Sequence, residues 1–184
     1  MPLKDIPYKR IRSLISIYLT NEESAVTRRF VKKLNDARKR GYLRKSELME
    51  ICRWKSPRAI RLVEGNTPGV IRRRSYSAFC SKNEIEKMNQ LISLKGVSIP
   101  MASAILTLTD PNRYGVLDIR VWQLLYKMKV VGQNPGGTGF NLNHWIRFLE
   151  ILRSFAADYN VRARDIERAL YDIHVEYQEG RLYR

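Results

Sequence analysis

The sequence predicts an all-α protein, and three features of the chain support this fold class. Apolar residues recur every third or fourth position over long stretches, which is the spacing of an amphipathic helix. No segment shows the strict apolar–polar alternation of a half-buried strand. Glycine, proline and capping residues separate the helical stretches. With 184 residues, the chain is long enough to bury a sizeable core.

Two helices are expected in the first part of the chain. Residues 1–20 carry apolar side chains, among them Ile6, at helical spacing. Asn21 is a favourable N-cap for the second helix. That helix ends in the cations 38–40 followed by Gly41, which suit a helix C-terminus. Its buried face is expected to hold Val26, Phe30, Leu34 and Ala37.

The next elements are delimited by proline and glycine. Residues 45–54 form a helix that Ser56-Pro57 breaks, and a short helix then leads to the loop GNTPG at 65–69. Residues 70–80 read as a helix with three consecutive arginines at 72–74. Because these arginines point in different directions around the helix, we interpret them as a solvated face.

The centre of the chain predicts a helical hairpin over residues 84–94 and 99–109. Gly96 follows the last apolar position of the first helix, where a left-handed residue is needed. Pro100 lies in the first turn of the second helix, a position that tolerates a missing N–H. An ordinary connection between two core helices would show the same pattern.

The turn of this hairpin is a candidate phosphate site. The amides of Val97, Ser98 and Ile99 are expected to lack intrahelical partners. Together with the positive end of the helix dipole, they would face a phosphate oxygen. Lys95 adds a positive charge beside them.

The C-terminal part is expected to contain three more helices. Asp118 opens the first of them, which extends to about Met128. Residues 130–141 form a Gly/Pro-rich loop without the residue order of a phosphate-binding loop, and we interpret it as a connector. Asn143 is the expected cap of a helix that carries Trp145, and the last helix covers 162–177.

Composition indicates a polyanionic partner. The formal net charge is +16 and the pI is about 10.1, which favours nucleic acid over an anionic membrane surface.

Cys52 and Cys80 are too few for a disulfide framework or a cysteine metal site, which suits a reducing interior. With no signal peptide or membrane-length apolar run, a cytoplasmic protein is expected, nucleoid-associated if prokaryotic.

The stretches LKGVSIPMASAIL, starting at Leu94, and VLDIRVW, starting at Val116, resemble the helix-hairpin-helix DNA glycosylase superfamily, in particular its endonuclease III and adenine glycosylase group. The family hairpin reads L-P-G-V-G. Here Lys95 replaces its proline and Ser98 its second glycine. Asp118 follows Gly96 by 22 residues, which is similar to the spacing between the family's hairpin glycine and its catalytic aspartate. The close resemblance covers about thirty residues.

This resemblance implies a fold of two helical lobes, one formed by residues 1–20 with 130–184 and the other by 21–129. It implies that Asp118 is catalytic, although N-capping alone would also explain an aspartate there. It permits a monovalent cation at the hairpin carbonyls. Two cysteines exclude the iron–sulfur cluster of many relatives, which needs four. No other metal site or cofactor is expected.

The function implied is a monofunctional glycosylase that acts on duplex DNA with a damaged or mismatched base in base excision repair. The lyase lysine of bifunctional relatives falls at Pro100. Hairpin residues 95–98 and Arg120 would contact DNA, and a monomer is expected. The candidates for stacking on a base are Tyr114, Trp54, Trp122 and Trp145, although a place in the core is the favoured interpretation for Trp122 and Trp145. His144 and His174 are taken as structural or surface residues.

Three alternatives stay open at this point. The chain could be a hairpin protein that binds abasic or branched DNA without catalysis, or an all-α RNA-binding protein in which Asp118 only caps a helix. It could also be a glycosylase whose lyase activity uses another lysine. Sequence does not rank the lysines considered for that role, which are Lys82, Lys87, Lys127 and Lys129.

Overall fold

A computed structural model of the chain describes residues 3–4 and 10–179, and over these residues the predicted all-α class is confirmed. The described part holds helices and a single isolated antiparallel bridge between Leu3 and Gln178. The helices are α1 (Ile11–Tyr18), α2 (Ala25–Arg40), α3 (Lys45–Lys55), the 3-10 helix η1 (Pro57–Ala59), α4 (Ile60–Glu64), α5 (Pro68–Cys80), α6 (Glu84–Ile92), α7 (Ile99–Thr109), α8 (Ile119–Lys127), α9 (Leu142–Tyr159) and α10 (Ala163–Tyr177). No helix in these ranges is long and apolar enough to cross a membrane.

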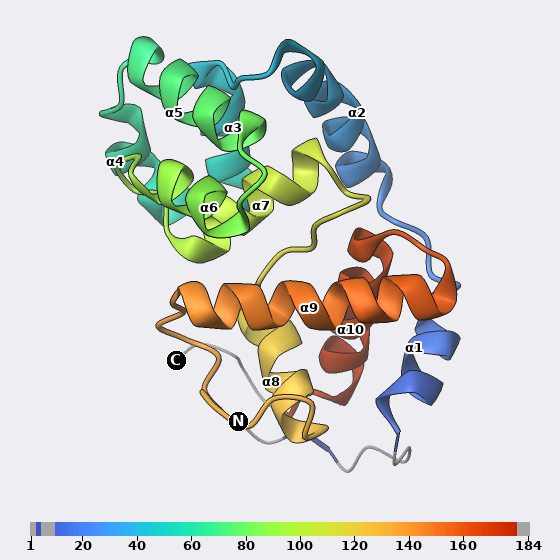
Figure 1. Cartoon of the computed structure of the whole chain (residues 1–184). Coiled ribbons are helices and arrows are strands. Elements are labelled where there is room, and N and C mark those ends of the chain that lie inside the picture. The colour runs from blue at the N-terminus through green and yellow to red at the C-terminus, as the bar shows by residue number, and fades with distance from the viewer. Residues whose placement is uncertain (1–2, 5–9, 180–184) are drawn as a thin grey trace.

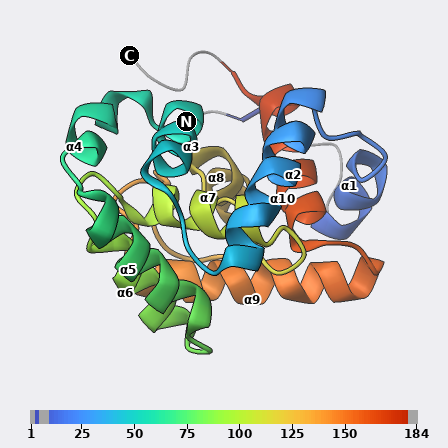
Figure 2. The same cartoon turned by 90° about the horizontal axis from the view of Figure 1, so that it is seen from above.

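The helices gather in two groups (Figure 1). Helices α2 to α7 occupy the upper part of that view, and α1, α8, α9 and α10 the lower part. The segment 110–118 passes from one group to the other, and α6 also touches α9. Figure 2 shows α7 and α8 near the middle of the molecule, with α9 along one side.

The division that the sequence suggested at residue 129 does not follow this packing. Helix α8 lies within the range 21–129, yet it packs against α10. Helix α1 also packs against α10, and the amide of Lys4 donates to the carbonyl of Tyr177 at 2.8 Å. The lower group therefore combines both described ends of the chain with α8, because the amphipathic face of α8 is buried there.

Three predicted helix starts are wrong by a few residues, since a different side chain forms the cap. Helix α2 begins after Ser24, whose hydroxyl accepts from the amide of Thr27, and not after Asn21. Asn141, rather than Asn143, caps α9 by accepting from the amide of His144 at 3.0 Å. Thr67 caps α5, so Pro68 and Gly69 belong to the helix and not to the loop.

Burial agrees with most of the predicted apolar faces. Leu34 and Ala37 are buried, but Val26, in the first turn of α2, is 71% exposed, so the apolar face predicted there is wrong at this residue. Ile6 lies outside the described residues. Trp122, Trp145 and Phe148 are among the largest fully buried side chains.

Gly115 lets the segment 110–118 lie close against the lower group. A Cβ atom at this position would come within 2.6 Å of both Glu167 Cβ and Leu152 Cδ1. Real Cβ atoms do not approach side-chain carbons so closely, so only glycine fits without displacing α9 or α10. This contact fixes the chain three residues before Asp118.

Candidate active site

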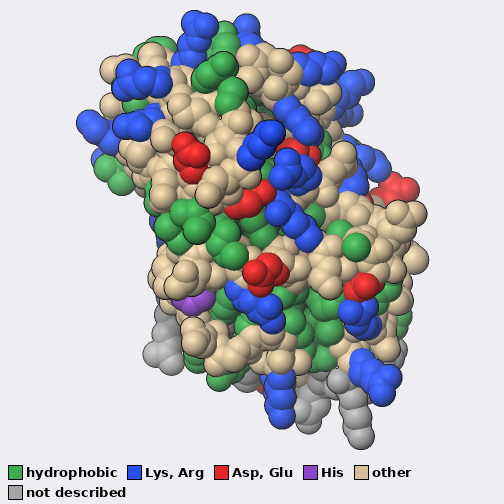
Figure 3. Space-filling view, viewed as in Figure 1, with side chains coloured by type: hydrophobic (Ala, Val, Ile, Leu, Met, Phe, Trp, Pro, Cys, Tyr) green, Lys and Arg blue, Asp and Glu red, His purple; other side chains and the backbone are tan. Residues whose placement is uncertain are grey.

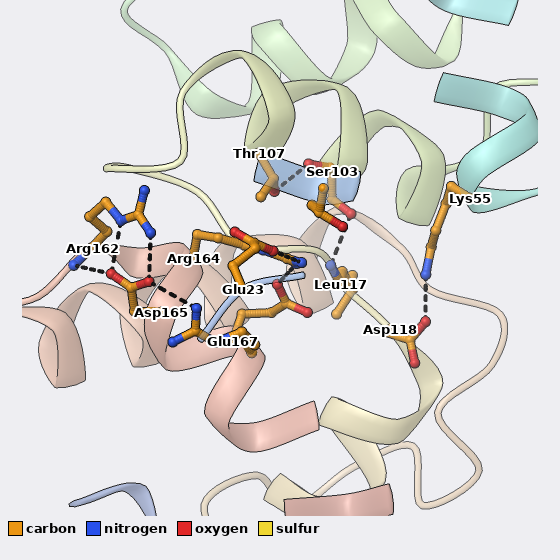
Figure 4. A network of polar contacts seen from close by, with 12 residues as sticks. Glu23, Lys55, Ser103, Thr107, Leu117, Asp118, Arg162, Arg164, Asp165 and Glu167 are labelled. Carbon is orange, nitrogen blue, oxygen red and sulfur yellow. Dashed lines mark hydrogen bonds and ion pairs between the residues drawn. The ribbon is translucent and has the colours of Figure 1, made fainter. Parts of the chain in front are cut away.

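Asp118 is held at the start of α8, where two hydrogen bonds position the backbone and the side chain. Its Oδ1 accepts from the amide of Arg120 at 2.9 Å, so the predicted N-cap is present. One residue earlier, the amide of Leu117 donates to Ser103 Oγ on α7 at 2.9 Å. Ser103 in turn donates to the carbonyl of Pro100 at 2.7 Å. The second hairpin helix and the segment that carries Asp118 are thus joined through one buried hydroxyl (Figure 4).

The other oxygen of Asp118 forms an ion pair with Lys55, a residue that sequence analysis did not single out. Lys55 is the last residue of α3, 63 positions before Asp118 in the chain. Its Nζ donates to Asp118 Oδ2, as Figure 4 shows. The two side chains are only 15% and 18% exposed. A lysine at a helix C-terminus is ordinary in sequence, so no local signal marks this one.

The surroundings of Asp118 keep its carboxylate ionised. Burial acts to raise its pKa, but the charge and hydrogen bond of Lys55 act against burial. The amide and charge of Arg120 add to this effect, and the pKa of Asp118 is held below its ordinary value of 3.8. Asp118 is therefore an anion at neutral pH, as a carboxylate that stabilises positive charge or takes up a proton must be.

Asp118 and Lys55 line a cleft of about 650 Å³. The hairpin contributes Ser98 and Pro100 to the same cleft, and α8 contributes Arg120. A volume of this size suits a ligand pocket in which a nucleobase would fit. The cleft thus brings together the predicted carboxylate and part of the predicted DNA-binding turn.

Gly96 is required at the hairpin turn for two reasons. Its φ is +77°, in the left-handed region that glycine favours. A Cβ there would also lie 2.8 Å from Leu62 Cβ. Asn66, which the sequence did not indicate, clamps the turn from the neighbouring loop: its Oδ1 accepts from the amide of Lys95 at 2.9 Å, and its Nδ2 donates to the Lys95 carbonyl at 3.0 Å. The side chains of Lys95 and Ser98 stay exposed.

The turn offers fewer free amides than we predicted. Val97 is buried, and its amide donates to the carbonyl of Leu94 in the turn at 3.1 Å, so the prediction that this amide binds a phosphate is wrong. Among the described residues, the amides of Ser98 and Ile99 donate to no backbone carbonyl. A phosphate at the turn would therefore be bound by these two amides and the Lys95 ammonium.

A monovalent cation at the hairpin carbonyls stays a prediction. The carbonyls of Leu94 and Lys95, which a monovalent ion could contact, already accept hydrogen bonds from Val97 and from Asn66. These bonds close the turn.

Of the aromatic residues predicted to contact a base, only Trp54 lines the cleft. Tyr114 is 3% exposed, stacks on Trp145 and donates to Glu84 at 3.0 Å. Trp122 is 1% exposed, and its indole donates to the carbonyl of Gln133 at 3.1 Å. Tyr114 and Trp122 are therefore core residues, so neither belongs to a base pocket, and the favoured core interpretation of Trp122 is confirmed. Trp145 is in the core, as predicted.

Two further aromatic rings line the cleft, and the sequence did not indicate them. Phe140 comes from the loop 130–141, which is thus more than a connector. Tyr171 comes from α10, and the guanidinium of Arg120 lies 5.4 Å from the centre of its ring. Arg120 is half-buried at this position. Both rings belong to amphipathic or loop segments that reach the cleft only through tertiary packing.

A buried ionic network forms one wall of the cleft (Figure 4). Arg164 on α10 pairs with Glu23 at 2.6 Å and with Glu167, and the three side chains are at most 10% exposed. Burial raises the pKa of Glu167; Arg164 opposes this and the nearby Asp118 carboxylate reinforces it. The network links the start of α2 to α10 beside the candidate site.

The histidines take structural positions. His174 is fully buried, and its Nε2 lies 3.1 Å from Gln123 Oε1. Burial lowers the pKa of His174 to about 4, so the ring is neutral at physiological pH. His144 packs edge-on to Trp122 and forms the capping box of α9 with Asn141. Neither histidine lines the cleft.

The charge of the molecule is consistent with a polyanionic partner. Five cationic side chains and two carboxylates line the cleft. Elsewhere, Figure 3 shows Lys and Arg side chains spread over the face with α9 in front, with acidic side chains between them. The cleft therefore has an excess of positive charge of its own, in addition to the net charge of +16 of the whole chain.

Replacing Ser103 with alanine is expected to destabilise the fold by about 1–3 kcal/mol, because the buried amide of Leu117 loses its acceptor. The free energy of unfolding in urea measures this loss. Ser93→Ala is the control, since the Ser93 hydroxyl bonds to the carbonyl of Gln90 on an exposed surface and should change stability by less than about 0.5 kcal/mol. Equal stability of Ser103→Ala and the unsubstituted protein would contradict the role of this bond.

The chain is weakly similar to a solved structure of a known protein. No family model matches the chain, and no curated protein matches it. Among solved structures, it is similar to the Methanocaldococcus jannaschii 8-oxoguanine glycosylase/lyase, determined in complex with 15mer DNA containing 8-oxoguanine. The two chains are 14% identical, the match covers 91% of this chain and 82% of the other, and the TM-score is 0.47. Because the likeness is this weak, assignment of a function depends on the chain's own residues.

Proposed function

We propose that this protein is a DNA glycosylase that releases a damaged or mismatched base from duplex DNA. The observation that carries the proposal is the shared cleft of Asp118 and the hairpin residues Ser98 and Pro100. A duplex anchored by a phosphate at the hairpin amides would present a nucleotide to a cleft that holds an ionised carboxylate. The resemblance of the hairpin and the Asp118 segment to the helix-hairpin-helix superfamily agrees with this role.

The chemistry requires few groups. As the N-glycosidic bond breaks, positive charge develops on the deoxyribose, and the Asp118 carboxylate would stabilise that charge near C1′. Trp54, Phe140 and Tyr171 offer ring faces and edges to an extruded base. The excess of cationic side chains would draw the DNA backbone toward the cleft.

The nucleophile is the second part of the proposal. Pro100 at the position of the family's lyase lysine favours hydrolysis, with Asp118 orienting and deprotonating a water molecule. Lys55, which lies against Asp118, is a second candidate for the nucleophile. The base is released whether water or a lysine amine attacks the sugar.

The test is a panel of duplexes, each with a single lesion or mismatch, incubated with the protein and analysed for free base by mass spectrometry. We expect release from at least one duplex and none from undamaged DNA. Tight binding without release from any duplex would favour a non-catalytic protein for abasic or branched DNA. Preference for folded RNA over every duplex would favour the RNA-binding alternative.

A further inference from the structure

We propose that Lys55 is the nucleophile of this site, attacking C1′ to form a Schiff base and giving the protein abasic-site lyase activity. The inference rests on the proposed glycosylase function and names the group that attacks the sugar. It would replace the monofunctional mechanism expected from Pro100.

Position is the first argument. Lys55 Nζ touches the carboxylate that would lie against C1′, so a sugar placed at Asp118 is also within reach of the amine. Lys55 is the one lysine among the cleft-lining residues that the structure describes. It extends from the last turn of α3, whose helical backbone supports it on a rigid element (Figure 4).

The lysines that the sequence offered for this role lie elsewhere. Lys87 is buried, and its Nζ donates to the carbonyls of Ser81 and Ala78, away from the cleft. Lys127 and Lys129 line a separate cavity of about 460 Å³. Lys82 is exposed on the loop before α6. None of them lines the cleft of Asp118.

Environment is the second argument. Lys55, paired with Asp118, is 15% exposed, whereas Lys33, paired with Glu50, is 56% exposed. Burial of an ion pair carries a desolvation cost that an exposed pair avoids, so a pair kept in a cleft is often retained for function. Asp118 is correctly placed to accept a proton from the ammonium and leave a nucleophilic amine.

The reaction balances in protons and electrons. The Lys55 ammonium gives one proton to Asp118, and the neutral amine then forms a bond to C1′. The N-glycosidic bond breaks, its electron pair leaves with the base, and Asp118 passes the proton to that base. The amine next loses a second proton, while the C1′–O4′ bond breaks and O4′ takes up a proton. The product is an iminium between Nζ and C1′.

Strand cleavage follows from the iminium. A base, Asp118 or water, removes a proton from C2′, the electron pair moves into a C2′–C3′ double bond, and the 3′ phosphate departs with the electrons of the C3′–O bond. Water then hydrolyses the iminium, which restores the Lys55 ammonium and releases an unsaturated aldehyde. No oxidant, reductant or metal is needed.

The first experiment uses a duplex with a preformed abasic site, so that it does not depend on which base is released. The protein and this duplex are incubated with sodium borohydride, which reduces an iminium to a stable covalent adduct. We expect an adduct that migrates with the DNA in denaturing gels, and peptide mass mapping should place it on Lys55.

Variants separate the nucleophile from a merely structural ion pair. Lys55→Arg keeps the charge and the partner of Asp118 but has no primary amine, and we expect it to abolish the adduct while retaining DNA binding. Lys33→Arg is the matched control, because Lys33 forms an exposed ion pair with Glu50, and its adduct should equal that of the unsubstituted protein. An adduct that persists in Lys55→Arg would overturn the proposal, as would DNA binding without any adduct.

The two proposals fail in distinguishable ways. Free base released from a lesion duplex, with no trapped adduct and strand breaks only after alkali, would leave the glycosylase intact and overturn the role of Lys55. An adduct on Lys55 at abasic sites, with no base released from any lesion, would leave the lyase intact and overturn the glycosylase.

Discussion

Replacing Asp118 with asparagine is expected to lower base release by about 10²–10⁴-fold, the range observed when a positioned acid or base is removed. Asparagine is also a good N-cap, so the hydrogen bond to the amide of Arg120 and the start of α8 should persist. The substitution thus removes the carboxylate charge, and with it the ion pair to Lys55, while the helix cap is kept. The measurement is the single-turnover rate of base release on the duplex that the lesion panel identifies.

Asp36→Asn provides the matched control for this variant, because Asp36 is exposed on α2 and does not line the cleft. Affinity for the same duplex, measured at fixed salt, should change little in either variant, since Asp118 is an anion and is not expected to hold the phosphate backbone. Base release by Asp118→Asn at the rate of the Asp36→Asn control would show that the carboxylate only caps the helix.

Asp118 also affects stability in a pH-dependent way. Its pKa in the folded protein lies below the ordinary value of 3.8, so its ionised form is stabilised by folding. This contribution is present above the ordinary pKa and is lost as the pH falls through the folded one. The stability difference between the unsubstituted protein and Asp118→Asn should therefore shrink below about pH 4.

Replacing Arg164 with methionine is expected to destabilise the protein by about 3–5 kcal/mol, the largest stability loss that we predict. The guanidinium pairs with Glu23 and Glu167, and all three side chains are at most 10% exposed. Methionine fills similar space but leaves two carboxylates in the interior without a cation. The free energy of unfolding in urea measures the effect.

Arg147→Met is the matched control, because Arg147 and its partner Glu150 are 56% and 59% exposed; an exposed pair contributes about 0–1 kcal/mol. If Arg164→Met does not fold, the triple variant with Glu23→Gln and Glu167→Gln still tests the account. Removing all three charges together should recover much of the lost stability, since no unpaired charge then stays buried. A triple variant less stable than Arg164→Met itself would contradict this explanation.

Local sequence determined the helices and the hairpin. Helical spacing, glycine and proline act within a few residues, so the predicted elements over 45–54, 84–94 and 99–109 agree closely with α3, α6 and α7. Asp118 was predictable as a residue at a helix start for the same reason. Its proposed catalytic role came from the family resemblance and from its separation of 22 residues from Gly96 along the sequence. That role stays a prediction.

Several errors arose where two local signals compete. Ser24 and Asn141 cap their helices in place of Asn21 and Asn143, because neighbouring polar residues have similar capping preferences and tertiary packing selects between them. Tyr114 and Trp122 looked able to stack on a base, since an aromatic residue carries no local mark of whether its ring faces the core or a cleft.

Only the tertiary structure decided the contents of the site. Lys55 and Asp118 are 63 positions apart, and they meet because the segment after α7 crosses to the lower group of helices while the end of α3 lines the same cleft. The same packing brings Phe140 and Tyr171 to the cleft and encloses Arg164 between two glutamates. Sequence periodicity determines which residues are helical and which face of a helix is apolar. It does not determine which faces meet, because that depends on long-range contacts between segments with no common local pattern.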